Sequence, residues 1–364
     1  MKSKIWCPLY ISNLFLFFLC LSGGIKNSLN AQPATKAGLF DADEVIEITL
    51  SGNIRAVLND RTGKPKKYSS LLSVQNKDIH FISFPVELQT RGNYRRMKEN
   101  CNYPPLWIHF SKTGDQLNSV FKEQNKMKLV MPCQSDEYVI REWLVYKLYN
   151  LLTPLSFKSR LVKIKLEDPK IKKPVDPFYA LLLEEEKQMA GRNNLLAVEK
   201  KIKPEETQTD IFLMMAVFEY FISNTDWSVQ FLHNVKLLSK NEKDIPLTVP
   251  YDFDHAGIVS APYAHPAEEL QLKSVRERRF RGYCIKDLNK FNTVIEQFNN
   301  LKNDIYNVYK NCELLDAKYI RSTLQYLDDF YKTINNPKEW QKEFGYPCDE
   351  NGTGNIVIKG MKEN

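Results

Sequence analysis

The chain has 364 residues, of which 43% are hydrophobic and 12% aromatic, so it can fill a globular core and is not an intrinsically disordered protein. It carries 51 basic and 44 acidic side chains, a formal net charge of +7. Without residues 1–31, which hold three basic and no acidic side chains, 48 basic and 44 acidic side chains remain, a net charge near +4. This mild excess, without a long basic block, suits an anionic small ligand, and no nucleic-acid partner is expected.

The N-terminus has the layout of a secretory signal peptide. Two lysines precede an apolar run that ends at Leu21, and the small residue Ala31 follows at a suitable cleavage position. Residues 1–31 are therefore predicted to be removed. The mature protein would be exported, to the periplasm, the cell surface or the medium, with no stable transmembrane segment. Two alternatives stay open: the run persists as a membrane anchor, or Cys20 is lipidated.

Strand patterns dominate the next part of the chain. The stretch "VIEITLSGNIRAVLND" at 45–60 alternates around a Ser-Gly-Asn turn and predicts a β-hairpin. Further on, "PPLWIHF" and "KMKLVM" also have strand character. Among these strands, Ser135 can cap a helix over 136–152, whose apolar residues recur on one face.

From about residue 189 the patterns are helical. The stretch "DIFLMMAVFEYFISN" at 210–224 is apolar nearly all round and predicts a helix buried on every side. The basic run "RERRFRG" at 276–282 is typical of a solvated helix face, with attraction of an acidic substrate as the alternative. Two amphipathic helices are expected beyond residue 286.

These patterns predict an α+β protein, strand-rich first and helix-rich second, which is the order of a two-lobed phosphotransferase. Its expected parts are a signal peptide (1–31), a flexible leader (32–44), a strand-rich N-terminal lobe with one helix (45–188), a helical C-terminal lobe with catalytic and metal loops (189–335) and a polar tail (336–364).

Cysteine usage fits an oxidising compartment. Loss of the signal peptide leaves five of the seven cysteines, an odd number, so at least one thiol is free or pairs between chains. Cys101 and Cys133 flank two predicted strands and are the best candidates for a disulfide. No C-x-x-C occurs, so a structural zinc site is not expected.

Polar residues of three separate segments are expected to meet. Asp226 follows the buried helix, Asn234 opens a short strand, and Asp252 ends the next one. Phosphoryl transfer requires such a set: one carboxylate orients the attacking hydroxyl, and an Asn and an Asp hold magnesium. Asp254 would point to the opposite side, unless a turn after Phe253 brings both carboxylates onto the metal.

Four stretches in order, "LQTRGNYRR", "FYALLLEEE", "NTDW…HN" and "PYDFDHAG", span roughly Val86–Gly257. Together they resemble the spore coat protein H (CotH) kinase family and, more distantly, other atypical kinases that lack the His-Arg-Asp loop. The resemblance implies a two-lobed, atypical protein-kinase-like fold. It also implies ATP or another nucleotide with Mg²⁺ or Mn²⁺, and transfer to a hydroxyl of a protein or small-molecule acceptor.

Carried over by position, the resemblance implies roles for single residues. Asp226 looks like the catalytic aspartate and Asp252 like the metal-binding aspartate. Asn234 is similar to the metal-binding amide, with Gln230 as a competitor because the eight-residue gap is longer than usual.

The nucleotide clamp would come from other segments. Arg91 and Arg95 look like the arginine-rich turn that faces the phosphates. The strand "PPLWIHF" lacks the lysines that the family often has there, so Lys126 or Lys128 would contact phosphate. Glu185 either contacts the nucleotide sugar or begins the next helix as a solvated charge. No Gly-rich phosphate loop occurs.

A second hypothesis comes from another functional class: a non-catalytic, pseudokinase-like binding protein of the envelope or surface on the same scaffold. Fold does not imply function, and ATP is expected to be scarce outside the cytoplasmic membrane. The missing lysine and Gly-rich loop favour this hypothesis, and the retained Asp226, Asn234 and Asp252 favour the enzyme. No motif of a serine or zinc hydrolase occurs.

Overall fold

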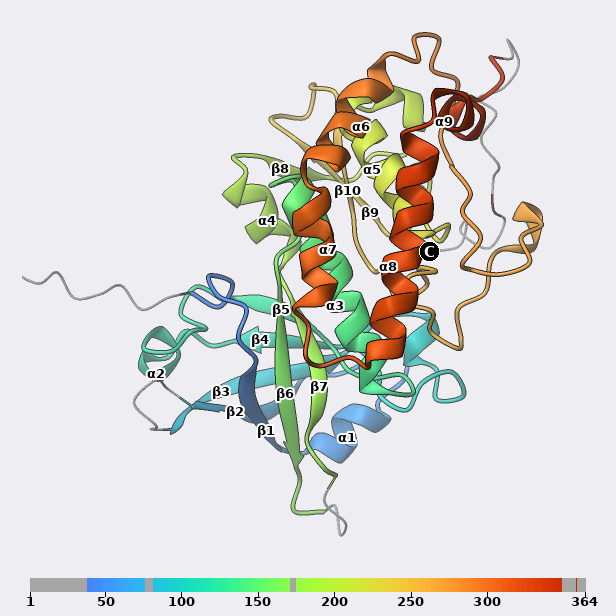
Figure 1. Cartoon of the computed structure of the whole chain (residues 1–364). Coiled ribbons are helices and arrows are strands. Elements are labelled where there is room, and N and C mark those ends of the chain that lie inside the picture. The colour runs from blue at the N-terminus through green and yellow to red at the C-terminus, as the bar shows by residue number, and fades with distance from the viewer. Residues whose placement is uncertain (1–37, 76–80, 171–174, 349–357, 359–364) are drawn as a thin grey trace, which may run out of the picture. The chain divides into compact units, whose positions relative to one another are not determined.

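The structure is a computed structural model that describes residues 38–75, 81–170, 175–348 and 358 (Figure 1). The predicted signal peptide, residues 1–31, lies outside the described residues. Within the described ranges, no helix is both long enough and apolar enough to cross a membrane.

Seven strands close into one barrel. They are β1 (Ile46–Gly52), β2 (Tyr68–Gln75), β3 (Phe81–Thr90), β4 (Leu106–Phe110), β5 (Lys126–Val130), β6 (Ser159–Glu167) and β7 (Phe178–Leu183). Neighbours run in the order β1-β2-β3-β4-β5-β7-β6, and every pair is antiparallel except β1 with β6. That parallel pair, with Ile46 opposite Val162, closes the sheet on itself.

The predicted α+β composition is confirmed, but the two-lobed, kinase-like architecture is wrong. The strand-rich part is a closed seven-stranded barrel accompanied by helices, which does not match a two-lobed protein-kinase-like fold. Closure depends on the pairing of Ile46–Ser51 with Val162–Glu167, more than a hundred residues apart in the chain. Local patterns of alternation identify strands, but they carry no information about such a distant partner.

The predicted hairpin at 45–60 is also wrong. The chain follows β1 to Gly52, whose φ of +133° favours glycine, and then enters the short helix α1 (Ile54–Asn59). Ile54 and Val57, three residues apart, are both buried on one side of α1.

Alternation along β5 determines which side chains reach the site. Successive side chains of a strand point to opposite faces. Met127 and Leu129 pack inside the barrel, whereas Val130 belongs to the core of the helical part. Lys128 shares the face of Val130, so it points out of the barrel toward the helices and lines a cavity there.

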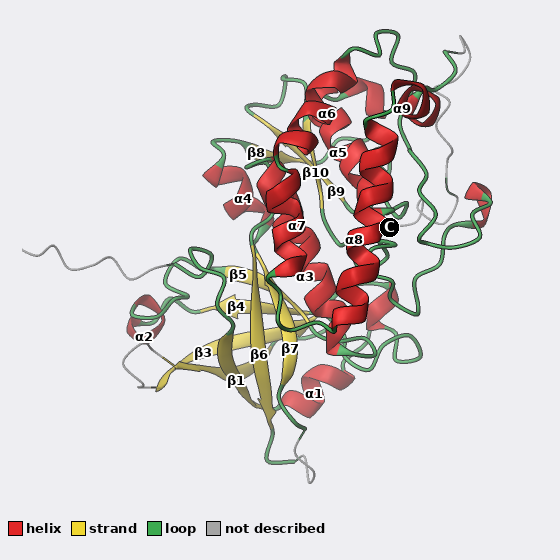
Figure 2. Ribbon diagram, in the orientation of Figure 1, coloured by secondary structure: helices red, strands yellow, loops and turns green. Residues whose placement is uncertain are grey.

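The rest of the described chain is mostly helical (Figure 2). The helices are α2 (Gly114–Leu117), α3 (Asp136–Leu152), α4 (Glu186–Arg192), α5 (Thr209–Ile222), α6 (Lys290–Asn300), α7 (Lys302–Lys310), α8 (Ala317–Ile334) and α9 (Pro337–Phe344). A three-stranded antiparallel sheet lies among them in the order β10-β9-β8, with β8 (Leu196–Val198), β9 (Val235–Ser239) and β10 (Leu247–Pro250).

Two predicted helices are confirmed. The hydroxyl of Ser135 accepts a hydrogen bond from the N–H of Glu137 and caps α3. Every residue from Phe212 to Ile222 of α5 is buried, as an all-round apolar sequence predicts. This buried helix gives the loop that follows it a fixed starting point.

The disulfide prediction is confirmed as well. Cys101 is bonded to Cys133, and a second disulfide joins Cys284 to Cys348. Among the described cysteines, Cys312 is buried and forms no disulfide within the chain.

Candidate active site

The segment after α5 carries the central carboxylate. Ser223 adopts a left-handed conformation, with φ of 55°, and ends the helix. Asp226 follows, and both of its carboxylate oxygens are bound: Oδ1 lies 3.0 Å from His233 Nε2, and Oδ2 accepts a hydrogen bond of 3.0 Å from Asn234 Nδ2. The predicted proximity of Asp226 and Asn234 is therefore observed.

Hydrogen bonds keep Asp226 ionised. Burial acts to raise the pKa of its carboxyl group, but the hydrogen bond from His233 and the positive charges that His255 and His233 can carry hold this pKa below its usual value. An ionised, fixed carboxylate is suited to orient a hydroxyl group of an acceptor.

The second carboxylate stands at the end of β10. Asp252 has a φ of 64°, a conformation that is rare for residues other than glycine. Its N–H donates to the hydroxyl of Tyr146 at 2.9 Å, and its Oδ1 lies 3.0 Å from Nζ of Lys128. Asn234, with a φ of 51°, is left-handed too. Backbone strain of this kind is typical of functional sites.

The Lys128 ion pair sets the charge of Asp252. Burial alone would raise the pKa of this carboxyl group, but the ammonium of Lys128, followed by the guanidinium groups of Arg95 and Arg91, holds it well below its usual range. The ion pair with Lys128 therefore favours the anionic form of Asp252.

Asp254 and Arg95 form a neighbouring pair. Oδ2 of Asp254 lies 3.5 Å from a terminal guanidinium nitrogen of Arg95 and accepts a hydrogen bond of 3.1 Å from the hydroxyl of Tyr263. Arg95 also donates to the carbonyl of Met131 at 2.6 Å. Burial disfavours the charge of Arg95, but its acidic neighbours, Tyr263 and Asp254 first, raise its pKa above the usual value.

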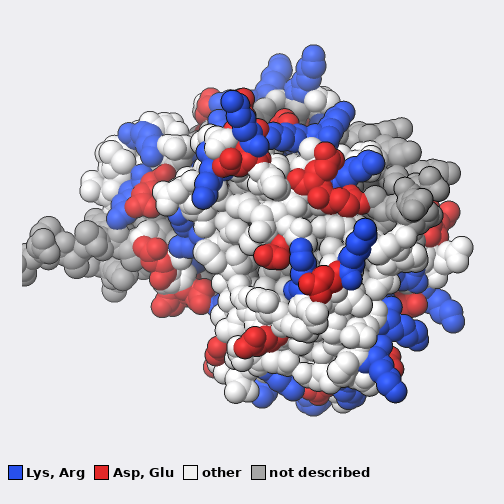
Figure 3. Space-filling view, turned by 90° about the horizontal axis from the view of Figure 1, so that it is seen from above, with Lys and Arg blue, Asp and Glu red and all other residues white. Residues whose placement is uncertain are grey.

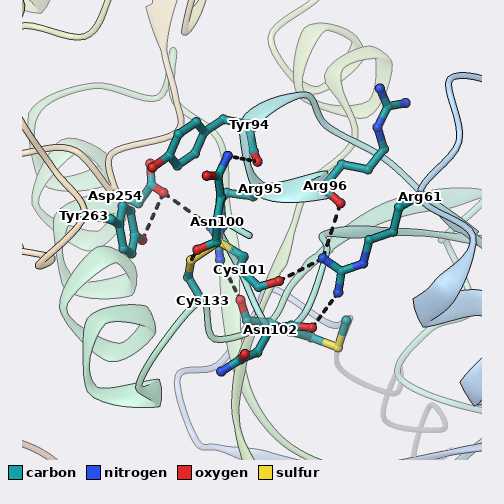
Figure 4. Close-up of a disulfide and its surroundings, with 11 residues drawn as sticks. Arg61, Tyr94, Arg95, Arg96, Asn100, Cys101, Asn102, Cys133, Asp254 and Tyr263 are labelled. Atoms are coloured by element: carbon teal, nitrogen blue, oxygen red, sulfur yellow. Dashed lines mark hydrogen bonds and ion pairs between the residues drawn. A yellow bond between two sulfur atoms is a disulfide. The ribbon is translucent and has the colours of Figure 1, made fainter. Parts of the chain in front are cut away.

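A disulfide anchors the loop that carries Arg95 (Figure 4). Cys101 ends this loop, and its bond to Cys133 fixes it to the segment between β5 and α3. The guanidinium group of Arg61 donates to the carbonyls of Arg96, Cys101 and Asn102, at 3.3, 2.8 and 2.6 Å. The loop is therefore held covalently and by hydrogen bonds.

Arg91 stands at the start of the same loop. Its guanidinium carbon lies 4.5 Å from the ring centroid of Trp107, and Nζ of Lys126 lies 3.9 Å from that centroid. Burial lowers the pKa of Arg91, and the carboxylate of Asp252 opposes that effect. An anion bound beside Arg91 would stabilise its charge further.

These side chains surround one cavity of about 240 Å³. Its lining residues are Arg91, Gly92, Asn93, Tyr94, Arg95, Pro105, Lys128, Asp226, Leu232, His233, Asn234, Tyr251, Asp252, Asp254 and His255. Seven of the eight residues predicted for the site are among them. Gln230, the competitor of Asn234, is absent from this lining.

Glu185 is the predicted residue that does not line the cavity. It lies at the N-cap of α4, and its carboxylate accepts a hydrogen bond of 3.1 Å from the N–H of Lys187. This position agrees with the alternative that Glu185 begins a helix as a solvated charge.

Sequence reasoning missed Glu142, a buried carboxyl group of α3 beside the cavity. Burial and the negative charges of Asp254 and Asp252 raise the pKa of Glu142 to about 8, although Arg95 and Lys128 oppose them. Its Oε1 makes no hydrogen bond among the described residues. No local signal identifies Glu142, because α3 also carries the partly exposed Glu137, and burial of Glu142 depends on what packs against the helix.

The oxygen donors of the cavity fit a hard cation. Lys128 uses Oδ1 of Asp252, and Asn234 uses its amide N–H for Asp226, so Oδ2 of Asp252 and the single amide oxygen of Asn234 can serve as ligands. Within the described part of the chain, no group of three or more His, Cys, Asp or Glu side chains is arranged to hold a metal. Two protein oxygens match Mg²⁺, which takes its other ligands from phosphates and water.

Comparisons with known proteins add little. No protein-family model matches the chain, and no curated protein matches it. Among solved structures, it is similar to the proinflammatory kinase CtkA of Helicobacter pylori, with a TM-score of 0.40 and 10% sequence identity over 68% of this chain and 92% of that chain. A TM-score this low does not show a shared fold, so no residue role is taken from that kinase, and the resemblance to the CotH family stays a prediction.

Proposed function

We propose that the protein is a metal-dependent phosphotransferase, which moves the terminal phosphoryl group of a nucleotide to a hydroxyl of a protein or small-molecule acceptor. The observation that supports this proposal best is the meeting of an ionised, doubly held Asp226 with the Lys128–Asp252 ion pair and Arg91 in one cavity. The negative charge of Asp226 is thus available to activate the acceptor, and the positive charges of Lys128 and Arg91 are available to bind phosphate.

Asp226 acts on the acceptor. Its carboxylate orients the acceptor hydroxyl and takes its proton as the acceptor oxygen bonds to phosphorus. At the same time the bond from phosphorus to the bridging oxygen breaks, and the nucleoside diphosphate leaves. His233 and Asn234 fix both carboxylate oxygens, so the group needs little rearrangement before it acts.

Cationic side chains bind the phosphate groups of the nucleotide. Lys128 and Arg91 line the cavity and neutralise phosphate charge. Arg95 is already bound to Asp254 and to the carbonyl of Met131. Its contribution is therefore to fix the loop, and with it the position of its own guanidinium charge. Mg²⁺ or Mn²⁺ bound with the nucleotide would supply further charge neutralisation, with Asp252 and Asn234 as its protein ligands and Asp254 nearby.

One face of the molecule carries charges of both signs without a concentration of either. On the face shown in Figure 3, basic and acidic side chains are interspersed around a largely uncharged area. That face therefore offers no extended field of one sign to a macromolecular polyanion.

The test is a comparison of nucleotide binding with turnover. The mature chain is titrated with ATP and Mn²⁺ by calorimetry and then incubated with labelled ATP, with ADP as the measured product. We expect Asp226→Asn to bind ATP within about twofold of wild type but to lose at least about 100-fold in turnover, the usual effect of removing a general base. Asp252→Asn should weaken metal-dependent binding. Asp304→Asn, on the exposed side of α7, is the matched control.

Two results would contradict the proposal. One is the absence of ATP binding by the wild type in the presence of either metal. The other is binding that Asp252→Asn leaves unchanged. Metal-dependent binding without any turnover would instead favour the second hypothesis, a non-catalytic nucleotide-binding protein.

A further inference from the structure

The basic run at 276–282 contacts the loop that carries Asp226. The prediction of a solvated helix face is wrong here, because these residues form no helix and Arg281 is only 5% exposed. The segment is well anchored: the carbonyl of Phe280 accepts a hydrogen bond of 2.8 Å from the hydroxyl of Tyr346, and Cys284, just beyond it, is in a disulfide with Cys348.

Arg281 binds the backbone on both sides of Asp226. One terminal nitrogen of its guanidinium group donates to the carbonyl of Thr225 at 2.8 Å and also to the carbonyl of Trp227. The guanidinium carbon lies 5.2 Å from the ring centroid of Trp227. One buried cation therefore contacts the residue before and the residue after Asp226.

The peptide bond that leads into Asp226 is held at both ends. Its C=O, from Thr225, points to Arg281, and its N–H, from Asp226, donates to Oδ1 of Asn224 at 3.1 Å. Because the C=O and N–H of a trans peptide point in opposite directions, these two bonds fix the plane of the peptide. The carbonyl of Asp226 in turn accepts a hydrogen bond of 2.8 Å from Asn234.

Arg281 is a cation in this setting. Burial lowers its pKa to about 10, while acidic groups, Tyr346 first and then Asp226 and Glu219, oppose that effect. It therefore stays charged at neutral pH, and hydrogen bonds from a charged donor are stronger than those from a neutral one.

We propose that Arg281 is a positioning residue of the active site, which fixes the direction of the Asp226 carboxylate by bridging the carbonyls of Thr225 and Trp227. This inference rests on the proposed function, because that function gives Asp226 the task of orienting the acceptor. Arg281 itself does not line the cavity and touches no reacting atom. Its loss should lower the rate of transfer rather than the affinity for nucleotide.

The chain offers a matched control in the same segment. Arg278 is partly buried. It donates to the carbonyl of Phe221 at 3.2 Å and to that of Tyr326 at 2.7 Å, and its guanidinium carbon lies 3.6 Å from the ring centroid of Tyr326. It therefore binds the end of α5 and helix α8, but not the loop that carries Asp226. Replacing it removes a partly buried cation that also donates to two carbonyls, without touching the backbone beside Asp226.

The experiment compares Arg281→Met with Arg278→Met. We expect Arg281→Met to lower kcat by about 10- to 100-fold, as small misplacements of a catalytic group do, with the Kd for ATP and Mn²⁺ within about twofold of wild type. Arg281→Lys, which keeps the charge but not the planar donor group, should be intermediate. Arg278→Met should keep the kcat of wild type within about threefold. If Arg281→Met does not fold, Arg281→Lys against Arg278→Lys decides by the same criteria.

A second measurement does not need turnover. Hydrogen exchange of the Asp226 amide, which bonds to Asn224, should accelerate at least about tenfold in Arg281→Met and stay unchanged in Arg278→Met. If the wild type transfers no phosphate, the proposed function fails, and this exchange result alone decides on Arg281. Unchanged exchange in Arg281→Met, or equal acceleration in both variants, would overturn the inference, as would an equal loss of kcat in both.

Discussion

The ammonium nitrogen of Lys128 lies 3.0 Å from Oδ1 of Asp252, although 124 residues separate them in the chain. Lys128 extends from β5 of the barrel and Asp252 from the end of β10, so their ion pair joins the barrel to the three-stranded sheet beside the cavity. The Lys128 side chain is 5% exposed and that of Asp252 29%. Burial lowers the pKa of Lys128, and the carboxylate of Asp252 acts to raise it again. Lys128 in turn lowers the pKa of Asp252, so each group stabilises the charged form of the other.

A double-mutant cycle should detect this dependence. We expect Lys128→Met and Asp252→Asn each to lower the free energy of unfolding by about 1–3 kcal/mol, below the 3–5 kcal/mol of a fully buried pair because Asp252 reaches water in the cavity. Comparison of the double variant with the two single variants should give a coupling energy of about 1 kcal/mol or more. Urea unfolding at pH 7 measures these quantities, and purely additive effects would contradict the prediction.

The same pair has a pH dependence of known sign. Because the pKa of Asp252 is lower in the folded than in the unfolded state, its contribution is full above the unfolded value of about 4 and is lost as the pH falls below that value. The coupling energy between Lys128 and Asp252 should therefore persist at pH 6 and shrink on acidification. A coupling that grows below pH 4 would contradict this assignment.

Glu142 should act in the opposite direction. Its folded-state pKa of about 8 lies above the unfolded value, so the folded state retains a proton that the unfolded state releases. The free energy of unfolding should therefore fall as the pH rises from about 4.5 to 8. Glu142→Gln cannot titrate, so its free energy of unfolding should not show this fall. Between pH 5 and pH 8, the free energy of unfolding of Glu142→Gln should therefore rise relative to that of wild type by on the order of 1–4 kcal/mol. Glu137→Gln, on the same helix but partly exposed, is the control, and a pH-independent difference for Glu142→Gln would contradict the prediction.

The sequence indicates which residues meet in the cavity better than it indicates the fold that carries them. Asp226 and Asp252 could be found because each follows directly on an apolar element, where an unpaired carboxylate would be costly to bury. The turn with Arg91 and Arg95 was found through its resemblance to the CotH family. Barrel closure, in contrast, depends on the distant pairing of β1 with β6, and no local pattern reports it.

Two further errors have a shared physical cause. The basic composition of the run at 276–282 predicts solvent exposure, and the apolar face of α3 gives no indication that Glu142 is buried as well. Burial of Arg281 and Glu142 depends on what the rest of the chain places beside them: the carbonyls of Thr225 and Trp227 for the former, and the charges of Lys128 and Arg95 for the latter. Composition alone cannot supply such partners.

Glu184 and Glu185 are adjacent but should respond differently to mutation. Glu184 is buried and forms two contacts with Arg192, at 3.1 and 3.0 Å, and one with the N–H of Lys158 at 2.9 Å. Glu184→Gln should lower the free energy of unfolding by about 1–3 kcal/mol, because it leaves the Arg192 charge without its carboxylate. Glu185→Gln should cost at most about 1 kcal/mol, the size of a helix-cap effect.

Binding measurements extend this comparison to the nucleotide. Because Glu185 does not line the cavity, Glu185→Gln should leave the Kd for ATP and Mn²⁺ within about twofold of wild type. A tenfold weakening would restore the prediction that Glu185 contacts the nucleotide. Thermal unfolding and calorimetry on the same samples separate the two effects.

Removal of the Cys101–Cys133 disulfide should affect both stability and the site. The bond closes a loop with a sequence separation of 32, so the Cys101→Ser, Cys133→Ser double variant should lose about 3–4 kcal/mol in the free energy of unfolding. It should also weaken ATP binding several-fold, because the loop with Arg91 and Arg95 is no longer anchored next to β5 and α3.

The second disulfide is the control for that effect. Cys284→Ser with Cys348→Ser should also lower the free energy of unfolding, but it leaves the loop of Arg91 and Arg95 tied down and should keep the Kd for ATP and Mn²⁺ within about twofold. Equal affinities in both double variants would mean that Arg61, through its hydrogen bonds to three carbonyls of the loop, is sufficient to hold the arginines in place. Arg61→Met in the variant without the first disulfide would then produce the loss of affinity that the disulfide alone did not.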